Sequence, residues 1–285
     1  MNNARKNKLK DKAFRIWGIS CTLVGLILLV IFIGNIVIDG IGRIDWAFIT
    51  NLPSRKPENA GIYTAMMGTI WILGITCIIS FPLGVAAGIY LEEYAKKGRL
   101  SNLLEINISN LAGVPSIIYG LLGMEIFVRT LNLGASILAG SLTLSLLILP
   151  IIIVATRESI KAVPSTIKEA SFAMGATKWQ TVWNQTLPAS IGGILTGVIL
   201  ALSRAIGETA PLIVIGALAY VPFAPQSPMD EFSVMPMQIF NWVSRPQHGF
   251  ITNAAAAIII LLIITFVMNG IAVYFRNKWQ KKIKW

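Results

Sequence analysis

Long apolar runs alternate with short polar segments along the whole chain. About 20 apolar residues are needed to cross the hydrocarbon core of a bilayer, so each run can be tested against that length. Six runs are long enough, namely 16–38, 65–91, 106–128, 134–155, 189–220 and 252–275. The pattern therefore predicts an all-α, polytopic membrane protein with six transmembrane helices.

The first apolar run follows six Lys and Arg residues, an arrangement that also begins a secretory signal peptide. Its 23 residues exceed the apolar region of a signal peptide, and no small-residue cleavage pattern follows it. We therefore expect it to be a retained first transmembrane helix.

Composition supports membrane insertion and excludes several chemistries. Of the 285 residues, 55% are hydrophobic and only 13% are charged, whereas soluble domains carry about 25% charged residues. Cys21 and Cys77 lie in apolar runs, which gives no disulfide framework and no metal-ligand spacing. Because His248 is the only histidine, the sequence predicts neither a metal site nor a histidine-dependent catalytic triad.

Basic residues are unevenly distributed between the two sets of connecting segments. The N-terminal tail, segments 92–105 and 156–188, and the C-terminal tail together hold 18 Lys and Arg residues, against 5 in the alternate segments. Because Lys and Arg accumulate on the cytoplasmic side, both termini and the 156–188 loop are predicted to be cytoplasmic. The same bias accounts for the net charge of +11 without nucleic-acid binding.

Two charges interrupt the fifth apolar run, in the stretch SRAIGETAPL. Arg204 lies near mid-membrane, and Glu208 lies one helical turn further on the same face, so the two can pair. One interpretation is a neutralised ion pair that holds this helix to a neighbour. The other is a polar transport pathway, since ionisable residues at membrane depth often face one, and Ser203 and Thr209 would then belong to it.

The same stretch predicts a bend. Pro211 supplies no backbone N–H, so the carbonyl of Gly207 loses its helical partner, and glycine adds backbone freedom there. We expect the outer half of the helix to begin near Thr209. Its exposed N–H groups would then favour an anion.

Other interruptions have simpler interpretations. Pro82, Pro115 and Pro150 lie in the second, third and fourth runs, where a packed kink is the ordinary outcome. Glu125 and Arg129, near the outer interface, are expected to form an exposed pair.

The outer segment 221–251 is rich in proline. Within it, residues 234–243 can form an amphipathic helix, either on the membrane surface or against another protein. His248 is expected to be a surface loop residue.

The cytoplasmic loop 156–188 has a helical pattern of its own. Thr166 and Glu169 fit a capping box for a helix over 167–174, and Gly175 suits the left-handed residue that ends it. A second helical piece is predicted at 177–182. On these features alone the hairpin either joins two spans or docks another protein.

The hairpin resembles the coupling loop of ABC importer permeases. Glu169-Ala170-Ser171 stands for the Glu-Ala-Ala triplet, Gly175 follows at the family spacing, and Leu187-Pro188 closes the pattern. Ser171 in place of the second alanine and Gln185 in place of an isoleucine depart from it. The resemblance implies that these motif residues couple the chain to an ATPase.

Other stretches extend the resemblance over most of residues 50–275. NLPSRKPENAGIYTAMMGTI, PLGVAAGIYLEEYA, NLAGVPSIIYGLLG, SRAIGETAPL and SVMPMQIFNW are similar to the PstA-type permeases of phosphate ABC importers, within the binding-protein-dependent transport inner-membrane component family. The resemblance implies a type I ABC importer permease fold. It also implies a division into residues 1–64, with the basic tail, first helix and outer loop, a permease domain 65–275, and a basic tail 276–285.

What the resemblance implies about function is a heteromeric importer of inorganic phosphate in a bacterial or archaeal cytoplasmic membrane. Its partners would be a second, PstC-type permease, a dimer of PstB-type ATP-binding subunits and a PstS-type phosphate-binding protein. Arg204 would offer phosphate a transient positive site, and Glu208 would hold the guanidinium between passages.

The chain lacks a GxxxxGK[ST] phosphate-binding loop. We therefore expect a non-catalytic subunit without a cofactor of its own, with ATP and Mg used by the partner ATPase. The alternatives are a permease for another oxyanion, a secondary anion transporter, and a membrane-embedded enzyme. The last two fit less well, because neither paired repeats with acidic ion sites nor a cluster of catalytic residues is visible.

Overall fold

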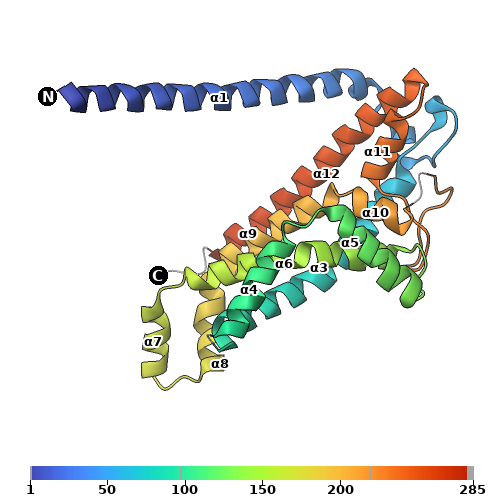
Figure 1. Ribbon diagram of the computed structural model, residues 1–285. Coiled ribbons are helices and arrows are strands. Elements are labelled where there is room, and N and C mark those ends of the chain that lie inside the picture. Colours follow the sequence, from blue (N-terminus) through green and yellow to red (C-terminus); the bar gives the residue numbers. More distant parts are fainter. Residues whose placement is uncertain (1, 97, 218–219, 281–285) are drawn as a thin grey trace.

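The computed structural model describes residues 2–96, 98–217 and 220–280, and every regular element in these ranges is a helix (Figure 1). The long helices are α1 (Asn2–Gly40), α3 (Tyr63–Ile89), α6 (Ile137–Lys161), α9 (Leu187–Ile206) and α12 (His248–Gln280). The shorter ones are α2 (Trp46–Thr50), α4 (Arg99–Leu111), α5 (Ser116–Gly123), α7 (Ser165–Ala173), α8 (Lys178–Thr181), α10 (Ala210–Ile215) and α11 (Met235–Val243). The predicted all-α class is confirmed.

Five of the six predicted spans correspond to helices long and apolar enough to cross a membrane. The exception is the run 106–128, where the prediction of a single helix is wrong. Helices α4 and α5 meet there at a bend of 102°. Pro115, at the N-terminal cap of α5, has no N–H to continue α4, and its ring disfavours a helical conformation at Val114.

The fifth run also departs from the prediction of a helical segment reaching residue 220. Helix α9 ends at Ile206, α10 ends at Ile215, and Gly216 has a φ of +104°. Such a positive φ is accessible to glycine at little cost and stops the helix there. At the other end, the π-helical turn Val182–Thr186 joins α8 to α9, so the helix begins well before residue 189.

Small residues allow α3, α6 and α9 to pack closely at the centre of the molecule. A Cβ at Gly197 would lie 2.1 Å from the Cβ of Ala155, and one at Gly84 would lie 2.6 Å from a methyl group of Ile152. Close backbone approach through small residues is the usual basis of helix association in membranes. Pro82 and Pro150 lie inside α3 and α6, which continue through them.

The outer end of the molecule is closed by a separate apolar cluster. Phe48, Trp242 and Phe250 pack there beside the first turns of α12. Helix α11 matches the amphipathic helix expected over 234–243. It packs on α12 and α3 of its own chain, with Trp242 1% exposed, rather than on the membrane surface or another protein as predicted.

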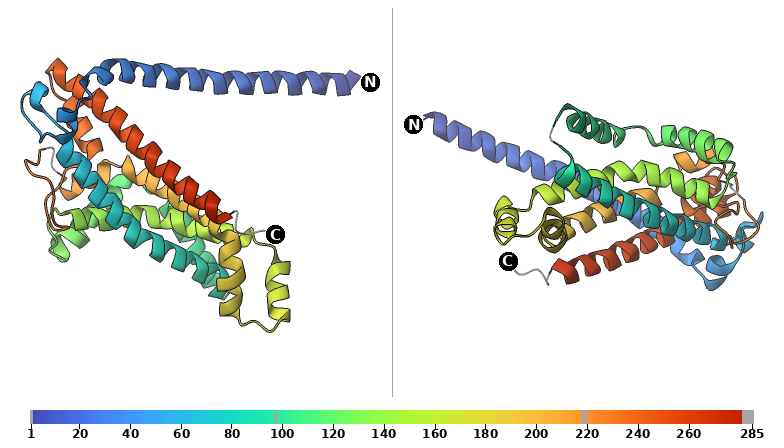
Figure 2. Two further views of the ribbon diagram at one scale, coloured as in Figure 1. Left: turned by 180° about the vertical axis from the view of Figure 1, so that it is seen from behind. Right: turned by 90° about the horizontal axis from the view of Figure 1, so that it is seen from below.

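Helix α1 leaves the bundle after a short contact with α12 and runs free for most of its length (Figures 1 and 2). Its apolar window is 0% buried, so the described part of the chain leaves most of α1 uncovered. The amino-terminal end of α1, the carboxyl-terminal end of α12 and the α7–α8 hairpin all point to the same end of the molecule (Figure 1).

Packing at Gly197 gives a test of the bundle. We expect Gly197→Ala to lower the free energy of unfolding of the detergent-solubilised chain by about 1–3 kcal/mol, and its melting temperature with it, because the added methyl group overpacks the α6–α9 contact. Gly74→Ala is the matched control, since a Cβ there meets nothing within 4 Å. Equal melting temperatures for the two variants, measured by tryptophan fluorescence, would contradict this packing.

Candidate functional site

Two broken helices meet in the middle of the bundle. The break between α9 and α10 lies at residues 207–209, and the break between α4 and α5 lies at residues 112–115. A Cβ at Gly120 in α5 would lie 2.7 Å from the Cα of Pro211 in α10, so α5 and α10 are in direct contact. Discontinuous helices leave polar backbone groups at membrane depth, which is tolerated where they line a cavity or are buried in protein.

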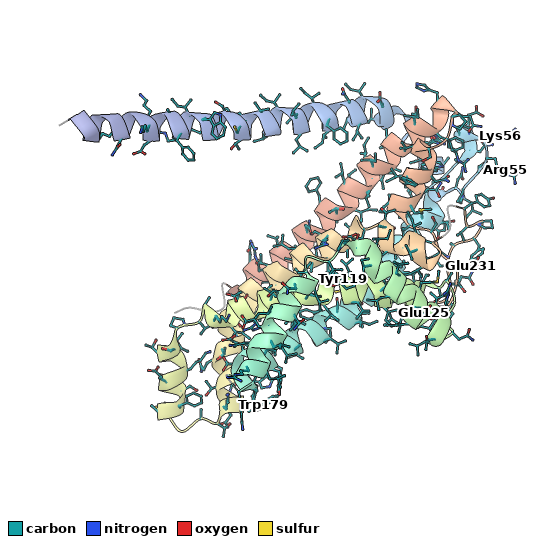
Figure 3. The ribbon with its side chains drawn as sticks, viewed as in Figure 1. Arg55, Lys56, Tyr119, Glu125, Trp179 and Glu231 are labelled. Carbon is teal, nitrogen blue, oxygen red and sulfur yellow. The ribbon has the colours of Figure 1, made fainter. Side chains whose placement is uncertain are left out.

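Tyr119 connects the two breaks. Its hydroxyl donates a hydrogen bond of 2.8 Å to the carbonyl of Leu111, at the end of α4. Its ring belongs to the same buried cluster as Ala201 and Ala205 of α9. Figure 3 shows Tyr119 in the middle of the molecule, between the outer end near Glu125 and the hairpin end near Trp179.

The predicted pairing of Arg204 with Glu208 is confirmed. The Nε atom of Arg204 lies 3.1 Å from Oε1 of Glu208. Arg204 is in the last turn of α9, where the negative end of the helix dipole favours a cation.

The two members of the pair differ in exposure. The side chain of Arg204 is 40% exposed and that of Glu208 is 15% exposed. Arg204 lies about 25 Å along α9 from Leu187 by the standard helical rise, so its exposed face is far from the hairpin end of the helix. Because a guanidinium at that depth is costly against lipid, this face must meet water or another protein.

Glu208 faces the interior of the chain. It borders a void of about 10 Å³ together with Thr69, Leu212 and Pro236, a space for about one water molecule. A phosphate ion does not fit there. Any anion that reaches Arg204 therefore approaches from its exposed side.

The other residues predicted for the pathway divide into two groups. The hydroxyl of Thr209 lies at the break, 3.4 Å from the carbonyl of Gly207 that Pro211 leaves without a helical donor. Ser203 points elsewhere, because its hydroxyl lies 2.7 Å from both the Ile199 carbonyl and Oδ1 of Asn269 in α12. Thr209 thus lies beside the ion pair, whereas Ser203 fastens α9 to α12.

The predicted bend at Gly207 and Pro211 is present, and α10 starts next to Thr209 as expected, although the Thr209 side chain forms no capping hydrogen bond. The anion-favouring helix terminus is a different matter. Helix α10 has only six residues, so its aligned peptide dipoles contribute little. The guanidinium of Arg204 is the positive group of this site.

The hairpin of α7 and α8 is the second candidate site. Gly175 has a φ of +80°, which confirms the left-handed residue predicted to end α7. The capping box predicted at Thr166 and Glu169 is wrong, because α7 begins at Ser165 after Pro164 and has no side-chain cap. The capping box is at Thr177 and Gln180 instead, where it starts α8.

The coupling motif is spread over different surroundings. Glu169 and Ala170 are exposed, while the hydroxyl of Ser171 lies 2.9 Å from that of Thr181 and ties α7 to α8. Leu187 and Pro188 lie in the first turn of α9 and line an apolar groove with Trp183 and Trp279. Glu169 and Ala170 therefore face outward, Ser171 joins the two helices of the hairpin, and Leu187 and Pro188 line the groove at the start of α9.

Sequence reasoning missed the apolar surface of the hairpin. Phe172, Met174 and Trp179 are 47%, 88% and 61% exposed. Large apolar side chains gathered on a polar hairpin are typical of a protein interface. The sequence around these three residues has no hydrophobic periodicity that would distinguish exposed from buried positions.

Two minor predictions are also resolved. Glu125 and Arg129 form an exposed pair with a distance of 3.1 Å, as expected. His248 is exposed, although it lies at the first residue of α12 rather than in a loop.

Comparison with known proteins identifies the class. Residues 80–281 match the model of the family described as "Binding-protein-dependent transport system inner membrane component", and the chain belongs to this family.

Among relatives, a probable ABC transporter permease, YqgI, of Bacillus subtilis is 31% identical, with 91% of this chain and 93% of the relative covered. The phosphate transport system permease PstA of Yersinia pestis is 31% identical, with 94% and 91% covered. PstA 1 of Mycobacterium tuberculosis H37Rv is 30% identical, with 95% and 89% covered.

Solved structures confirm the fold. A chain of a bacterial alginate ABC transporter, in complex with an alginate-bound periplasmic protein, superposes with a TM-score of 0.67 at 14% identity and covers 94% of this chain and 96% of that one. A chain of the MetNI methionine ABC transporter gives a TM-score of 0.59 at 17% identity, covering 77% and 94%. The fold is therefore that of ABC importer permeases, as the resemblance implied.

Proposed function

We propose that this chain is the PstA-type permease subunit of an ATP-driven importer of inorganic phosphate. The observation that carries the proposal is Arg204, a cation at mid-membrane, partly exposed where two broken helices meet and held by Glu208. Relatives named as phosphate transport permeases cover nearly the whole chain and supply the identity of the anion.

In this mechanism the ion pair opens and closes as phosphate passes. Phosphate approaches the exposed side of Arg204 and accepts hydrogen bonds from the guanidinium, which suits its geometry. Glu208, fixed in the interior, competes for the same donors and so keeps phosphate from binding too tightly. A transport pathway requires such weak binding.

A single chain does not complete this pathway. The exposed face of Arg204 needs water or another protein beside it, and we assign that role to a PstC-type permease, against which the uncovered helix α1 would also pack. A PstS-type binding protein would deliver phosphate at the outer end. Two PstB-type ATPases would dock on the hairpins of the two permeases and use ATP and Mg, while this chain performs no catalysis.

This arrangement implies an orientation. The hairpin, the start of α1 and the end of α12 lie toward one end of the molecule (Figure 1), and the segments with most Lys and Arg belong to that end. We place it in the cytoplasm of a bacterium or archaeon.

The test is uptake of radiolabelled phosphate by proteoliposomes that contain the four kinds of subunit. We expect ATP-dependent uptake, and a loss of about tenfold or more in Arg204→Gln, since a charge-assisted hydrogen bond contributes ~1.5–3 kcal/mol. Arg129→Gln, in an exposed pair of the same spacing, is the matched control.

Three outcomes contradict the proposal. Absent uptake with the unaltered chain contradicts the substrate, unchanged uptake in Arg204→Gln contradicts the pathway role, and failure of Arg204→Gln to assemble assigns the ion pair to structure.

The hairpin provides a test of ATPase docking. We expect Glu169→Lys and Gly175→Val to reduce co-isolation of the ATPase subunit roughly tenfold, which corresponds to ~1.4 kcal/mol of lost binding. The first reverses the charge at an exposed position of the proposed docking surface. The second strains the backbone of a residue whose φ is +80°.

Lys56→Glu is the control, because Lys56 is exposed at the opposite end of the molecule (Figure 3). Full ATPase recovery with the hairpin variants would show that docking occurs elsewhere.

A further inference from the structure

The end of α3 is a π-helical turn, Tyr90–Tyr94, that carries two adjacent glutamates. Adjacent residues on a helix point in different directions, and these two contact different elements. Oε2 of Glu92 lies 3.5 Å from the guanidinium of Arg157 in α6. Oε1 of Glu93 lies 2.6 Å from Nζ of Lys168 in α7.

Both arms of the hairpin are held by this one turn. Lys168 belongs to α7, and Lys178, at the first residue of α8, places its Nζ 5.1 Å from the ring centre of Tyr94. The side chains of Glu93 and Lys168 are only 10% and 24% exposed. An ion pair shielded from solvent in this way is much less screened than a surface pair.

The next residue along the chain has the opposite environment. Glu169 is exposed on the outward face of α7, whereas Lys168 points to the end of α3. The Lys168–Glu93 pair therefore lies between the outward face of α7 and the end of α3.

The same turn is linked to the broken helix α4. Arg157, 9% exposed, contacts Glu92 and also Glu105 of α4 at 2.9 Å. The far end of α4 accepts the hydrogen bond from Tyr119, whose ring packs in the cluster that includes Ala205 of α9. A continuous series of contacts thus joins the hairpin to the break between α4 and α5.

We infer that the Glu93–Lys168 ion pair is a positioning contact that transmits movement of the hairpin to the membrane helices, and that it sets how much transport each ATP hydrolysed produces. This inference rests on the proposed importer function. Neither residue touches substrate or nucleotide, so both act through the elements that they join.

The experiment uses the assembled importer in proteoliposomes and measures phosphate transported per ATP hydrolysed. In Glu93→Gln and Lys168→Met we expect this ratio to fall several-fold while ATP hydrolysis continues. Glu93→Lys combined with Lys168→Glu should restore it. Glu125→Gln is the matched control, because its pair with Arg129 lies within one π-helical turn and joins no two elements.

A second readout does not depend on the substrate. Ser116→Cys, at the start of α5, is introduced into a chain with Cys21→Ser and Cys77→Ser, and its labelling by an impermeant maleimide is compared with and without ATP and vanadate. We expect an ATP-dependent change that is lost in Glu93→Gln and Lys168→Met and regained in the charge swap.

Several results overturn the inference. They are an unchanged transport ratio in both single variants, an ATP-dependent labelling change that persists in them, and no such change in the parental complex. Failure of the single variants to assemble, with assembly but not the ratio restored by the swap, assigns the pair to folding. Absent phosphate uptake alongside a labelling change that follows the ion pair contradicts the proposed substrate and leaves this inference supported.

Discussion

The ion pair between Arg204 and Glu208 is the constraint on which the rest of the site depends. A guanidinium at mid-membrane requires a counter-ion, polar surroundings and protection from lipid. Glu208 supplies the counter-ion, and the breaks in two helices supply polar backbone groups around it. Protection from lipid is not complete within the described residues of the chain, because Arg204 remains partly exposed. Proline sets the breaks around the pair, and the exposed face of Arg204 is where the proposed importer would place a second permease.

The architecture combines two kinds of contact between helices. Helices α3, α6 and α9 pack through glycine and alanine and form the core of the bundle, and α5 packs directly on α6 and α10. The hairpin and α4 contact α3 and α6 through charged side chains as well. Charged contacts can exchange partners during a conformational change at lower cost than interlocked packing. The proposed coupling would therefore act through the charged contacts at the hairpin end and leave the packing of the core in place.

Local signals in the sequence predicted local structure well. Pro211 and Gly207 predicted the break after Ile206, because a missing backbone N–H and a flexible backbone affect the helix at the residue itself. Gly113 and Pro115 carry the same signals, but continuous hydropathy made α4 and α5 look like one span. The contact between Glu93 and Lys168, 75 residues apart, had no local signature. The capping pattern occurs at both Thr166 and Thr177. Because α7 already begins at Ser165, Thr166 lies inside the helix, and only Thr177 occupies a cap position.

Binding of radiolabelled phosphate to the assembled importer, after removal of the binding protein, tests the role of the ion pair most directly. If Glu208 competes with phosphate for the guanidinium of Arg204, Glu208→Gln will retain phosphate more tightly than the unaltered complex. Adding Arg204→Gln will abolish that gain. Equal retention in all three complexes, each shown to be fully assembled, would contradict the account and reduce the pair to a structural contact.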